Sequence, residues 1–224
     1  MDVAPFRLSG TVYATLLNHR RSLAALGEAV AAAPYKGAPK SVVLAVKPGH
    51  SLVAPGGAMQ VDDSGEALEI GATLGLVIGR TACAVAPADA LGHVAGFIVV
   101  CDGTLPRESH YRPQIRAMAR DASCVLGAEV VASVAVGDPD ALAIRVFVDG
   151  ALVQSTSTAE NVRSAARLIA EVSDFMTLRP GDMLLTGSAP DGPRVGAGAR
   201  IAIEIDGVGR LETRVVRSDA RASS

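Results

Sequence analysis

Two long apolar runs most constrain what this chain can fold into. Residues 68–79 read LEIGATLGLVIG, and residues 95–104 read AGFIVVCDGT. Each run combines β-branched residues with a Gly or Asp near its end, a pattern typical of strands buried on both faces. The polar run RESHYRP at 107–113 follows the second strand. Because binding sites are commonly built just past the end of a buried strand, we expect a site there.

The rest of the pattern predicts short strands and two helices. A helix is expected at 22–33, with Ser22 as its N-cap and Pro34 after its end, and Thr158 is a candidate N-cap for a second helix. Asp149-Gly150 is a strong hairpin signal. The further expected strands are residues 10–17, 41–46, 58–61, 130–134, 142–148, 201–205 and 211–216. Periodicity alone therefore predicts an α+β chain with many short strands.

Composition favours one large domain. Of the 224 residues, 49% are apolar, which is enough for one sizeable core, and Trp is absent, so Val, Leu, Ile and Ala must fill it. We expect an N-terminal extension at 1–9, a domain at 10–217 and a flexible tail at 218–224.

Several partner classes are disfavoured. The net charge is −2 and no basic cluster stands out, so nucleic acid is not an expected partner. No apolar run is long enough to span a bilayer, and the first ten residues lack a secretion-signal pattern. Cys83, Cys101 and Cys124 are odd in number and far apart, which suits a reducing cytoplasm and gives no metal-binding spacing.

Two motifs resemble the fumarylacetoacetate hydrolase family over roughly residues 10–216. The first is the strand pair at 68–104, where the family presents Glu-x-Glu, an apolar run ending Ile-Gly, and later Asn-Asp before Ser or Thr. The second is LRPGDMLLTGS at 178–188, which is similar to the family's Leu-x-Pro-Gly-Asp and Thr-Gly-Thr-Pro signature. The resemblance implies a mostly-β α+β fold, a mixed β-roll or small barrel with two main flanking helices.

The resemblance also implies a Mg²⁺ or Mn²⁺ ion held by three carboxylates. This chain keeps Asp102 at the third position, but Gly71 and Thr73 occupy the two glutamate positions. Hard cations of this kind require several oxygen ligands, so we expect that this chain does not bind the ion tightly. Glu69 shares the strand face with Gly71 but lies two residues earlier. Asp102 itself could simply begin an Asp-Gly turn.

Two further family features are absent. The acid/base pair of His and Glu falls on Ser22 and Ala25, and the lysine three residues before Asp121 is Met118. Hydrolysis needs a base to activate water, and neither Ser22 nor Ala25 supplies one.

The remaining candidate site residues follow from the resemblance and from their positions at strand ends. Lys47, Asp102 and Thr158 are the expected catalytic residues, although Lys47 could be a solvated strand end and Thr158 a helix cap. For His19 a half-buried histidine at a strand end, with no carboxylate partner, is favoured over a catalytic role. A Gly-hydroxyl strand end exposes backbone N–H groups that suit a carboxylate. The expected substrate-binding residues are Asn18, His19, Arg107, Gln154, Thr186, Gly187 and Ser188.

The resemblance leaves three functional hypotheses. Within the family, the sequence resembles the amino-terminal half of the bifunctional decarboxylase/isomerases of homoprotocatechuate (4-hydroxyphenylacetate) breakdown. The chain would then decarboxylate or isomerise an unsaturated 2-oxo dicarboxylate, as 5-oxopent-3-ene-1,2,5-tricarboxylate decarboxylases and 2-hydroxyhepta-2,4-diene-1,7-dioate isomerases do. Alternatively, it is a non-catalytic half that pairs with a related active chain, in a homodimer or hetero-oligomer. An acylpyruvate-type hydrolase is the third hypothesis.

Overall fold

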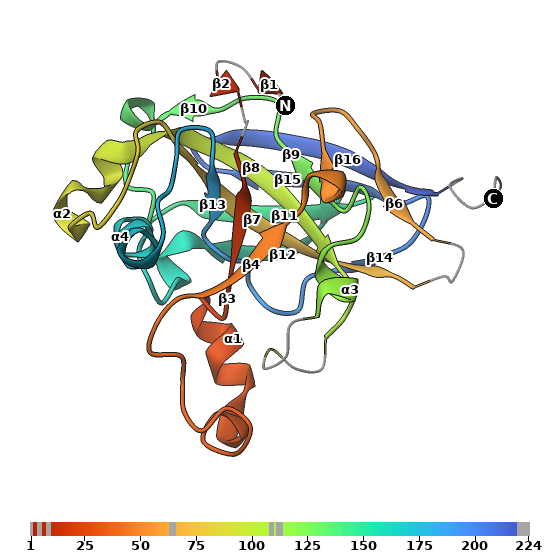
Figure 1. Ribbon diagram of the computed structural model, residues 1–224. Coiled ribbons are helices and arrows are strands. Elements are labelled where there is room, and N and C mark those ends of the chain that lie inside the picture. The colour runs from red at the N-terminus through yellow and green to blue at the C-terminus, as the bar shows by residue number, and fades with distance from the viewer. Residues whose placement is uncertain are drawn as a thin grey trace.

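A computed structural model describes residues 2–3, 6–7, 10–62, 66–107, 110 and 114–218 (Figure 1). Within these residues the chain forms a large curled sheet, a five-stranded sheet and a two-stranded ribbon of β1 (Asp2–Val3) and β2 (Phe6–Arg7). The expected mostly-β, barrel-like α+β fold is confirmed. No helix in the described part of the chain is long and apolar enough to cross a membrane.

The large sheet is organised on β7 (Leu68–Ile78) and β8 (Val94–Thr104), the two strands predicted from the apolar runs. They pair antiparallel along almost their whole length, with Gly71 opposite Asp102. Over the described residues the strand order is β4-β3-β13-β7-β8-β9-β5, with β10 beside β8 and β14 beside β7. The remaining strands of this sheet are β3 (Val12–Leu16), β4 (Val43–Lys47), β5 (Leu52–Val53), β9 (Cys124–Leu126), β10 (Val131–Ala132), β13 (Met183–Leu185) and β14 (Arg194–Val195).

This sheet curls until its two ends approach each other. β4 and β5 end the strand order on opposite sides, yet only Pro48 and the short helix η2 (Gly49–Ser51) separate them in sequence. The concave face buries a small apolar core whose members include Val12, Val100 and Leu185. The sheet is therefore a half-barrel with its own filled interior.

The convex face packs against the second sheet and one helix. The five strands run β12-β11-β15-β16-β6, and the helix α4 (Ala165–Phe175) buries Leu168, Ile169 and Val172 in the same large core. Tight turns join their hairpins at Asp149-Gly150, as the sequence predicted, and at Asp206-Gly207. The strands are β6 (Met59–Val61), β11 (Ala143–Val148), β12 (Ala151–Ser157), β15 (Arg200–Ile205) and β16 (Gly209–Arg217).

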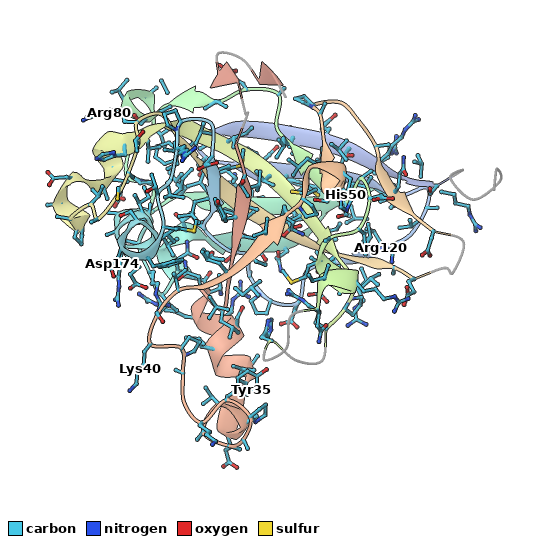
Figure 2. All side chains as sticks on the ribbon, in the orientation of Figure 1. Tyr35, Lys40, His50, Arg80, Arg120 and Asp174 are labelled. Atoms are coloured by element: carbon cyan, nitrogen blue, oxygen red, sulfur yellow. The ribbon has the colours of Figure 1, made fainter. Side chains whose placement is uncertain are left out.

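An arm formed by residues 19–42 projects from this body (Figure 1). It contains α1 (Arg20–Ala25) and the short helix η1 (Gly27–Val30), and neither helix buries a residue. Figure 2 shows Tyr35 and Lys40 on this arm, away from the sheets. The other short helices are α2 (Pro87–Ala90), η3 (Leu91–His93), α3 (Ile115–Met118), η4 (Ser133–Ala135) and η5 (Thr158–Glu160).

The predicted helix bounds were wrong at both main helices. The expected helix at 22–33 is split because Gly27 adopts a positive φ of 49°, and its N-cap is His19, not Ser22. The second helix is capped by Ser164, whose hydroxyl accepts from the Arg167 N–H at 3.2 Å. Thr158 instead begins η5.

Two strand predictions also needed correction. The hairpin signal at Asp149-Gly150 implied a strand after the turn, but the bounds of β12 were not predicted, because its polar residues Gln154 to Ser157 resembled a loop leading to a helix. The strand expected at 130–134 shortens to β10, after which the chain turns into η4.

Candidate functional site

The candidate site lies at one mouth of the half-barrel. The C-terminal ends of β3, β8 and β13 meet there with the first residues of β7 and enclose a cavity of about 40 Å³. Among the residues that line it are Asp102, Arg107, Gly187 and Ser188, four of the residues predicted from the sequence. Because a buried water needs about 10–15 Å³ by this measure, the cavity holds only a few waters or one small polar group.

Asp102 forms an ion pair with Lys47 at the base of this mouth. Lys47 is the last residue of β4, and its buried Nζ contacts Asp102 Oδ1 and donates to the Met118 carbonyl at 2.6 Å. The possibilities that Lys47 is a solvated strand end and that Asp102 only begins a turn are both wrong. Asp102 lies inside β8, which continues to Thr104, and Lys47 is completely buried because the sheet curls.

The residues present do not fit a divalent cation. No group of three or more His, Cys, Asp or Glu side chains that could hold a metal occurs in the described part of the chain. Gly71 offers no side chain, and a Cβ added there would lie 2.8 Å from Ser188 Oγ, so Ser188 occupies the space where a glutamate would begin. Thr73 is buried and contributes only a neutral hydroxyl. The one carboxylate kept from the family set, Asp102, is already paired with Lys47.

Glu69 does not replace the missing glutamates. It lines the cavity from the same face of β7, as predicted, but its Oε2 lies 3.8 Å from Arg194 Nε on the neighbouring strand β14. Its side chain is 30% exposed, so this ion pair lies at the outer rim of the mouth, away from the base where Asp102 is held.

The loop at 186–191 forms one wall of the cavity through Gly187, Ser188 and Ala189. The Thr186 N–H donates to Leu74 O at 2.9 Å, whereas the next three N–H groups have no hydrogen-bond partner within the described residues. Gly187 has a φ of 98°, a conformation that favours glycine. Successive free N–H groups around such a residue form a concavity suited to an anion.

Two side-chain amides hold the ends of this loop. Asn18 Nδ2 donates to the Thr186 carbonyl at 2.8 Å, and Gln154 Nε2 donates to the Pro190 and Asp191 carbonyls at 3.0 and 3.3 Å. Neither amide is among the residues that line the cavity. Asn18 and Gln154 therefore position the wall of the site, and the structure gives no direct contact of either with the cavity.

Thr158 and Thr186, both predicted site residues, are also absent from the cavity lining. The Thr158 hydroxyl accepts from the Leu142 N–H at 2.8 Å, which fixes the start of β11. The Thr186 hydroxyl is buried and finds no partner among the described residues. Sequence position alone could not show which side of the chain these hydroxyls face.

His19 is buried at the base of the arm with a carboxylate beside it. Its Nδ1 accepts from the Arg21 N–H at 3.2 Å, and its Nε2 lies 3.1 Å from Thr156 Oγ1 and 3.7 Å from Glu160 Oε2. The expectation that His19 has no carboxylate partner was wrong. Burial lowers the pKa of His19, the Glu160 charge opposes this shift, and Arg21 reinforces it. His19 caps the arm helix and lies outside the cavity lining.

The arm also reaches the rim of the site. The Tyr35 hydroxyl accepts from the backbone N–H of His110 at 2.8 Å. The nearby Arg107 lines the cavity, and its Nη1 lies 3.3 Å from the Met118 sulfur. The other members of the predicted polar run, residues 108–109 and 111–113, lie outside the described residues.

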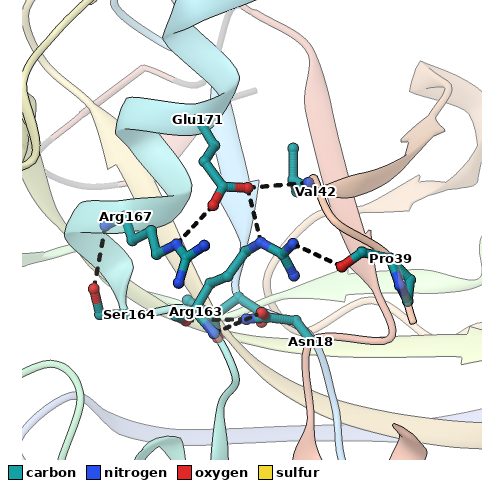
Figure 3. Close-up of polar contacts among 8 residues, drawn as sticks. Asn18, Pro39, Val42, Arg163, Ser164, Arg167 and Glu171 are labelled. Carbon is teal, nitrogen blue, oxygen red and sulfur yellow. Dashed lines mark hydrogen bonds and ion pairs between the residues drawn. The ribbon is translucent and has the colours of Figure 1, made fainter. Parts of the chain in front are cut away.

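Both stems of the arm are fixed by one buried arginine, a residue that the sequence analysis did not identify (Figure 3). The Arg163 backbone exchanges hydrogen bonds with the Asn18 amide, at 3.0 and 3.2 Å. Its Nε donates to Glu171 at 2.8 Å, and the same Glu171 oxygen accepts from the Val42 N–H at 3.0 Å. Since Asn18 also holds Thr186, this network connects the arm to the wall of the cavity.

The sequence and fold of this chain are similar to those of several known proteins. The sequence pattern of the family described as fumarylacetoacetate (FAA) hydrolase C-terminal matches residues 11–216. The chain is 36% identical over 209 residues to the 4-hydroxyphenylacetate degradation bifunctional isomerase/decarboxylase of Escherichia coli. The aligned region covers 93% of this chain and 48% of that protein. The chain thus spans about half the length of this relative. It is 31% identical over 191 residues to a mitochondrial oxaloacetate tautomerase of Xenopus laevis, covering 80% of this chain and 59% of the tautomerase.

Solved structures of similar shape carry related names. One is 5-carboxymethyl-2-hydroxymuconate delta-isomerase from Mycobacterium smegmatis, with a TM-score of 0.80, 27% identity, and coverage of 96% of this chain and 82% of that one. Another is fumarylpyruvate hydrolase from Pseudomonas aeruginosa in complex with Mn²⁺ and pyruvate, with a TM-score of 0.79, 26% identity, and coverage of 93% and 90%.

Proposed function

Because this chain belongs to the fumarylacetoacetate hydrolase family, we propose that it acts in 4-hydroxyphenylacetate (homoprotocatechuate) catabolism on an unsaturated 2-oxo dicarboxylate, by decarboxylation or isomerisation. The single observation that supports this most is the 36% identity to the bifunctional isomerase/decarboxylase of Escherichia coli over 93% of the chain. That relative is about twice as long as this chain. The proposal therefore takes from it only the kind of chemistry, and which of its two activities belongs to the matching half is part of the proposal.

The cavity has donors for one end of such a substrate. Arg107, Gly187 and Ser188 line a space that would seat a carboxylate or an oxo group, and the N–H groups of Gly187 and Ser188 have no hydrogen-bond partner within the described residues. In decarboxylation the bond to the leaving carboxylate breaks, CO₂ departs, and the electron pair moves through the conjugated chain to the oxo oxygen, forming an enolate. A proton then returns to carbon. Hydrogen-bond donors directed at the oxygen that gains charge would lower this barrier.

A divalent ion, where a family member holds one, supplies a Lewis acid for that same oxygen. Mn²⁺ is bound in a solved structure of a related hydrolase. The residues of this chain do not fit the ion, so no step of the proposed reaction is assigned to it. The tests below therefore include arms without divalent ions.

A second candidate function is a non-catalytic half that pairs with a related chain. Two observations favour it: the chain spans about half of its bifunctional relative, and two of the three family carboxylates are Gly71 and Thr73. The partner would be a second copy or a related chain with both glutamates, and the decarboxylase/isomerase activity would belong to the assembly. The acylpyruvate hydrolase hypothesis has less support. His19 lies outside the cavity lining, and Ser22 and Ala25, at the family's acid/base positions, provide no base to activate water.

The two candidates are separated by an assay of the purified chain. The substrates are 5-oxopent-3-ene-1,2,5-tricarboxylate and 2-hydroxyhepta-2,4-diene-1,7-dioate, followed by ultraviolet absorbance with EDTA or with Mg²⁺. Turnover by the chain alone that disappears in Arg107→Ala supports the catalytic candidate. Turnover only after addition of a related chain that retains Glu-x-Glu supports the pairing candidate. No turnover in either mixture contradicts the assignment to this substrate class.

A further inference from the structure

We propose that the Lys47 ammonium is the resident cation of the barrel mouth, in the electrostatic role of a divalent ion. The mouth would then receive a carboxylate ligand without any metal. The choice of ligand rests on the proposed function, whereas the assignment of Lys47 rests on the geometry of its own contacts. A mouth that binds no metal merely because it lacks ligands should not gain a response to metal when Lys47 is removed. A mouth whose remaining carboxylate is already paired with Lys47 should gain one.

The first step is the burial of Lys47. The exposed fraction of its side chain is 0%, and its Nζ has two oxygen partners, Asp102 Oδ1 and the Met118 carbonyl. A buried ammonium is strongly disfavoured unless it is paired and hydrogen-bonded, so Lys47 requires Asp102 as much as a metal would. Asp102 is 14% exposed and has no other basic partner among the ion pairs of the described residues.

The second step is competition at Asp102. A divalent ion placed on this carboxylate would lie within a few ångströms of Nζ and would be repelled by it. The repulsion would have to be balanced by other anionic ligands, as it is where two glutamates are present. Here Gly71 has no side chain and Ser188 fills the space beside it. Glu69 is drawn outward to Arg194, so the balance favours the lysine.

The third step concerns the charge that remains. The carboxylates of Asp102 and Glu69 line the cavity, and each is neutralised by a partner outside the lining, Lys47 and Arg194 respectively. Arg107 is the cation among the lining residues. Together with the N–H groups at 187–189, which have no partner within the described residues, Arg107 gives the mouth donors and a positive charge. Such a surface suits a carboxylate and offers little to a free cation.

The first experiment measures Mn²⁺ binding from the electron paramagnetic resonance signal of free Mn²⁺, together with the melting temperature in Mn²⁺ or EDTA. The wild-type chain should bind no Mn²⁺ at micromolar concentrations and melt at the same temperature in both. Lys47→Met frees Asp102, so this variant should melt lower in EDTA and recover in millimolar Mn²⁺. The double variant Lys47→Met/Asp102→Leu, which replaces the pair with apolar residues, should fold and show no response to Mn²⁺.

The matched control is Lys40→Met, which removes an exposed lysine on the arm and should behave as the wild type. One Mn²⁺ bound per wild-type chain at micromolar concentration overturns the proposal. So does a Lys47→Met variant that folds and responds to Mn²⁺ no more than the double variant. If Lys47→Met is unfolded in EDTA, folding restored by millimolar Mn²⁺ supports the proposal, and failure to fold in Mn²⁺ as well overturns it.

The second experiment uses pyruvate as the carboxylate probe, followed by saturation-transfer NMR of its methyl protons. Binding in EDTA that Mg²⁺ leaves unchanged supports the proposal. Binding that requires Mg²⁺ overturns it and leaves the proposed substrate class intact. Absence of binding in both conditions contradicts the proposed function, while the Mn²⁺ measurement continues to test the role of Lys47 independently.

Discussion

Gly71 and Asp102 lie directly opposite each other across the antiparallel ladder of β7 and β8. Side chains at opposed positions of such a ladder project to the same face, so a residue at 71 would stand beside the carboxylate of Asp102. In this chain the space beside Asp102 is instead occupied by Ser188, whose Oγ and Cβ would lie 2.8 and 3.1 Å from a Cβ at position 71. The absence of a side chain at 71 and the position of Ser188 are therefore one coupled feature.

This coupling predicts non-additive stability effects. Gly71→Ala should destabilise the chain by about 1–3 kcal/mol, because the new methyl group overpacks against Ser188. In a Ser188→Gly background the same change should cost clearly less, since both close side-chain contacts are gone. Urea unfolding of the four proteins measures the coupling. Gly92→Ala is the control: a Cβ there has nothing within 4 Å, and its effect should stay within about 0.5 kcal/mol. Additive effects of Gly71→Ala and Ser188→Gly would contradict the argument.

The sequence predicted the framework of the site better than its contacts. The paired strands at 68–79 and 95–104 and the hairpin at Asp149-Gly150 depend on local patterns, and the structure has them where expected. The pairing of Lys47 with Asp102 depends on the curl of a whole sheet, which no local pattern encodes.

The same limit applies to the arm. Glu160 meets His19, and Arg163 meets Asn18, only because distant segments converge at the base of the arm. In each case the interacting residues are ordinary surface types in the sequence, so nothing marks them as partners. Thr158 shows the converse error, since its hydroxyl is a plausible helix cap by sequence and in the structure serves β11.

Acid should weaken the fold through His19. Burial lowers the pKa of His19 relative to its usual value of 6.5, despite the opposing charge of Glu160. As the pH is lowered below 6.5, the histidine is protonated in the unfolded chain but stays neutral in the folded chain. The free energy of unfolding therefore decreases as the pH is lowered, until the pH reaches the lower pKa of the folded chain. His110, whose pKa burial and the Arg107 charge also lower, contributes in the same direction.

His19→Asn isolates the His19 contribution. Asparagine can still accept from the Arg21 N–H as an N-cap, yet it does not titrate. Between pH 7.5 and pH 5, unfolding free energies from urea titrations should fall less steeply in His19→Asn than in the wild type. Parallel pH profiles of the two proteins would show that His19 is not the responsible group.

The network of Figure 3 predicts unequal roles for two arginines that share one carboxylate. Arg163 Nε and Arg167 Nε lie 2.8 and 2.7 Å from different oxygens of Glu171, but their side chains are 6% and 55% exposed. Arg163→Met should cost about 3–5 kcal/mol because it removes one partner of a buried pair. Arg167→Met, at an exposed i,i+4 pair, should cost less than about 0.5 kcal/mol. Chemical denaturation measures both, and similar losses would refute the assigned difference.

Gln154 should affect ligand binding through the 186–191 loop without touching the ligand. Its Nε2 holds the Pro190 and Asp191 carbonyls, and the N–H groups at Gly187 and Ser188 lie on the same loop. Gln154→Ala releases that end, so the N–H groups are no longer held in place before the ligand arrives. A net hydrogen bond contributes about 0.5–1.5 kcal/mol, so pyruvate affinity should weaken about two- to tenfold.

The control is Ser155→Ala, at the next position of β12, where the side chain is exposed. This variant should bind pyruvate as the wild type does, and both variants should remain folded by circular dichroism. The dissociation constants come from saturation-transfer NMR titrations at constant protein concentration. Equal pyruvate affinity in Gln154→Ala and Ser155→Ala would mean that the anchored loop is not the carboxylate-binding wall of the cavity.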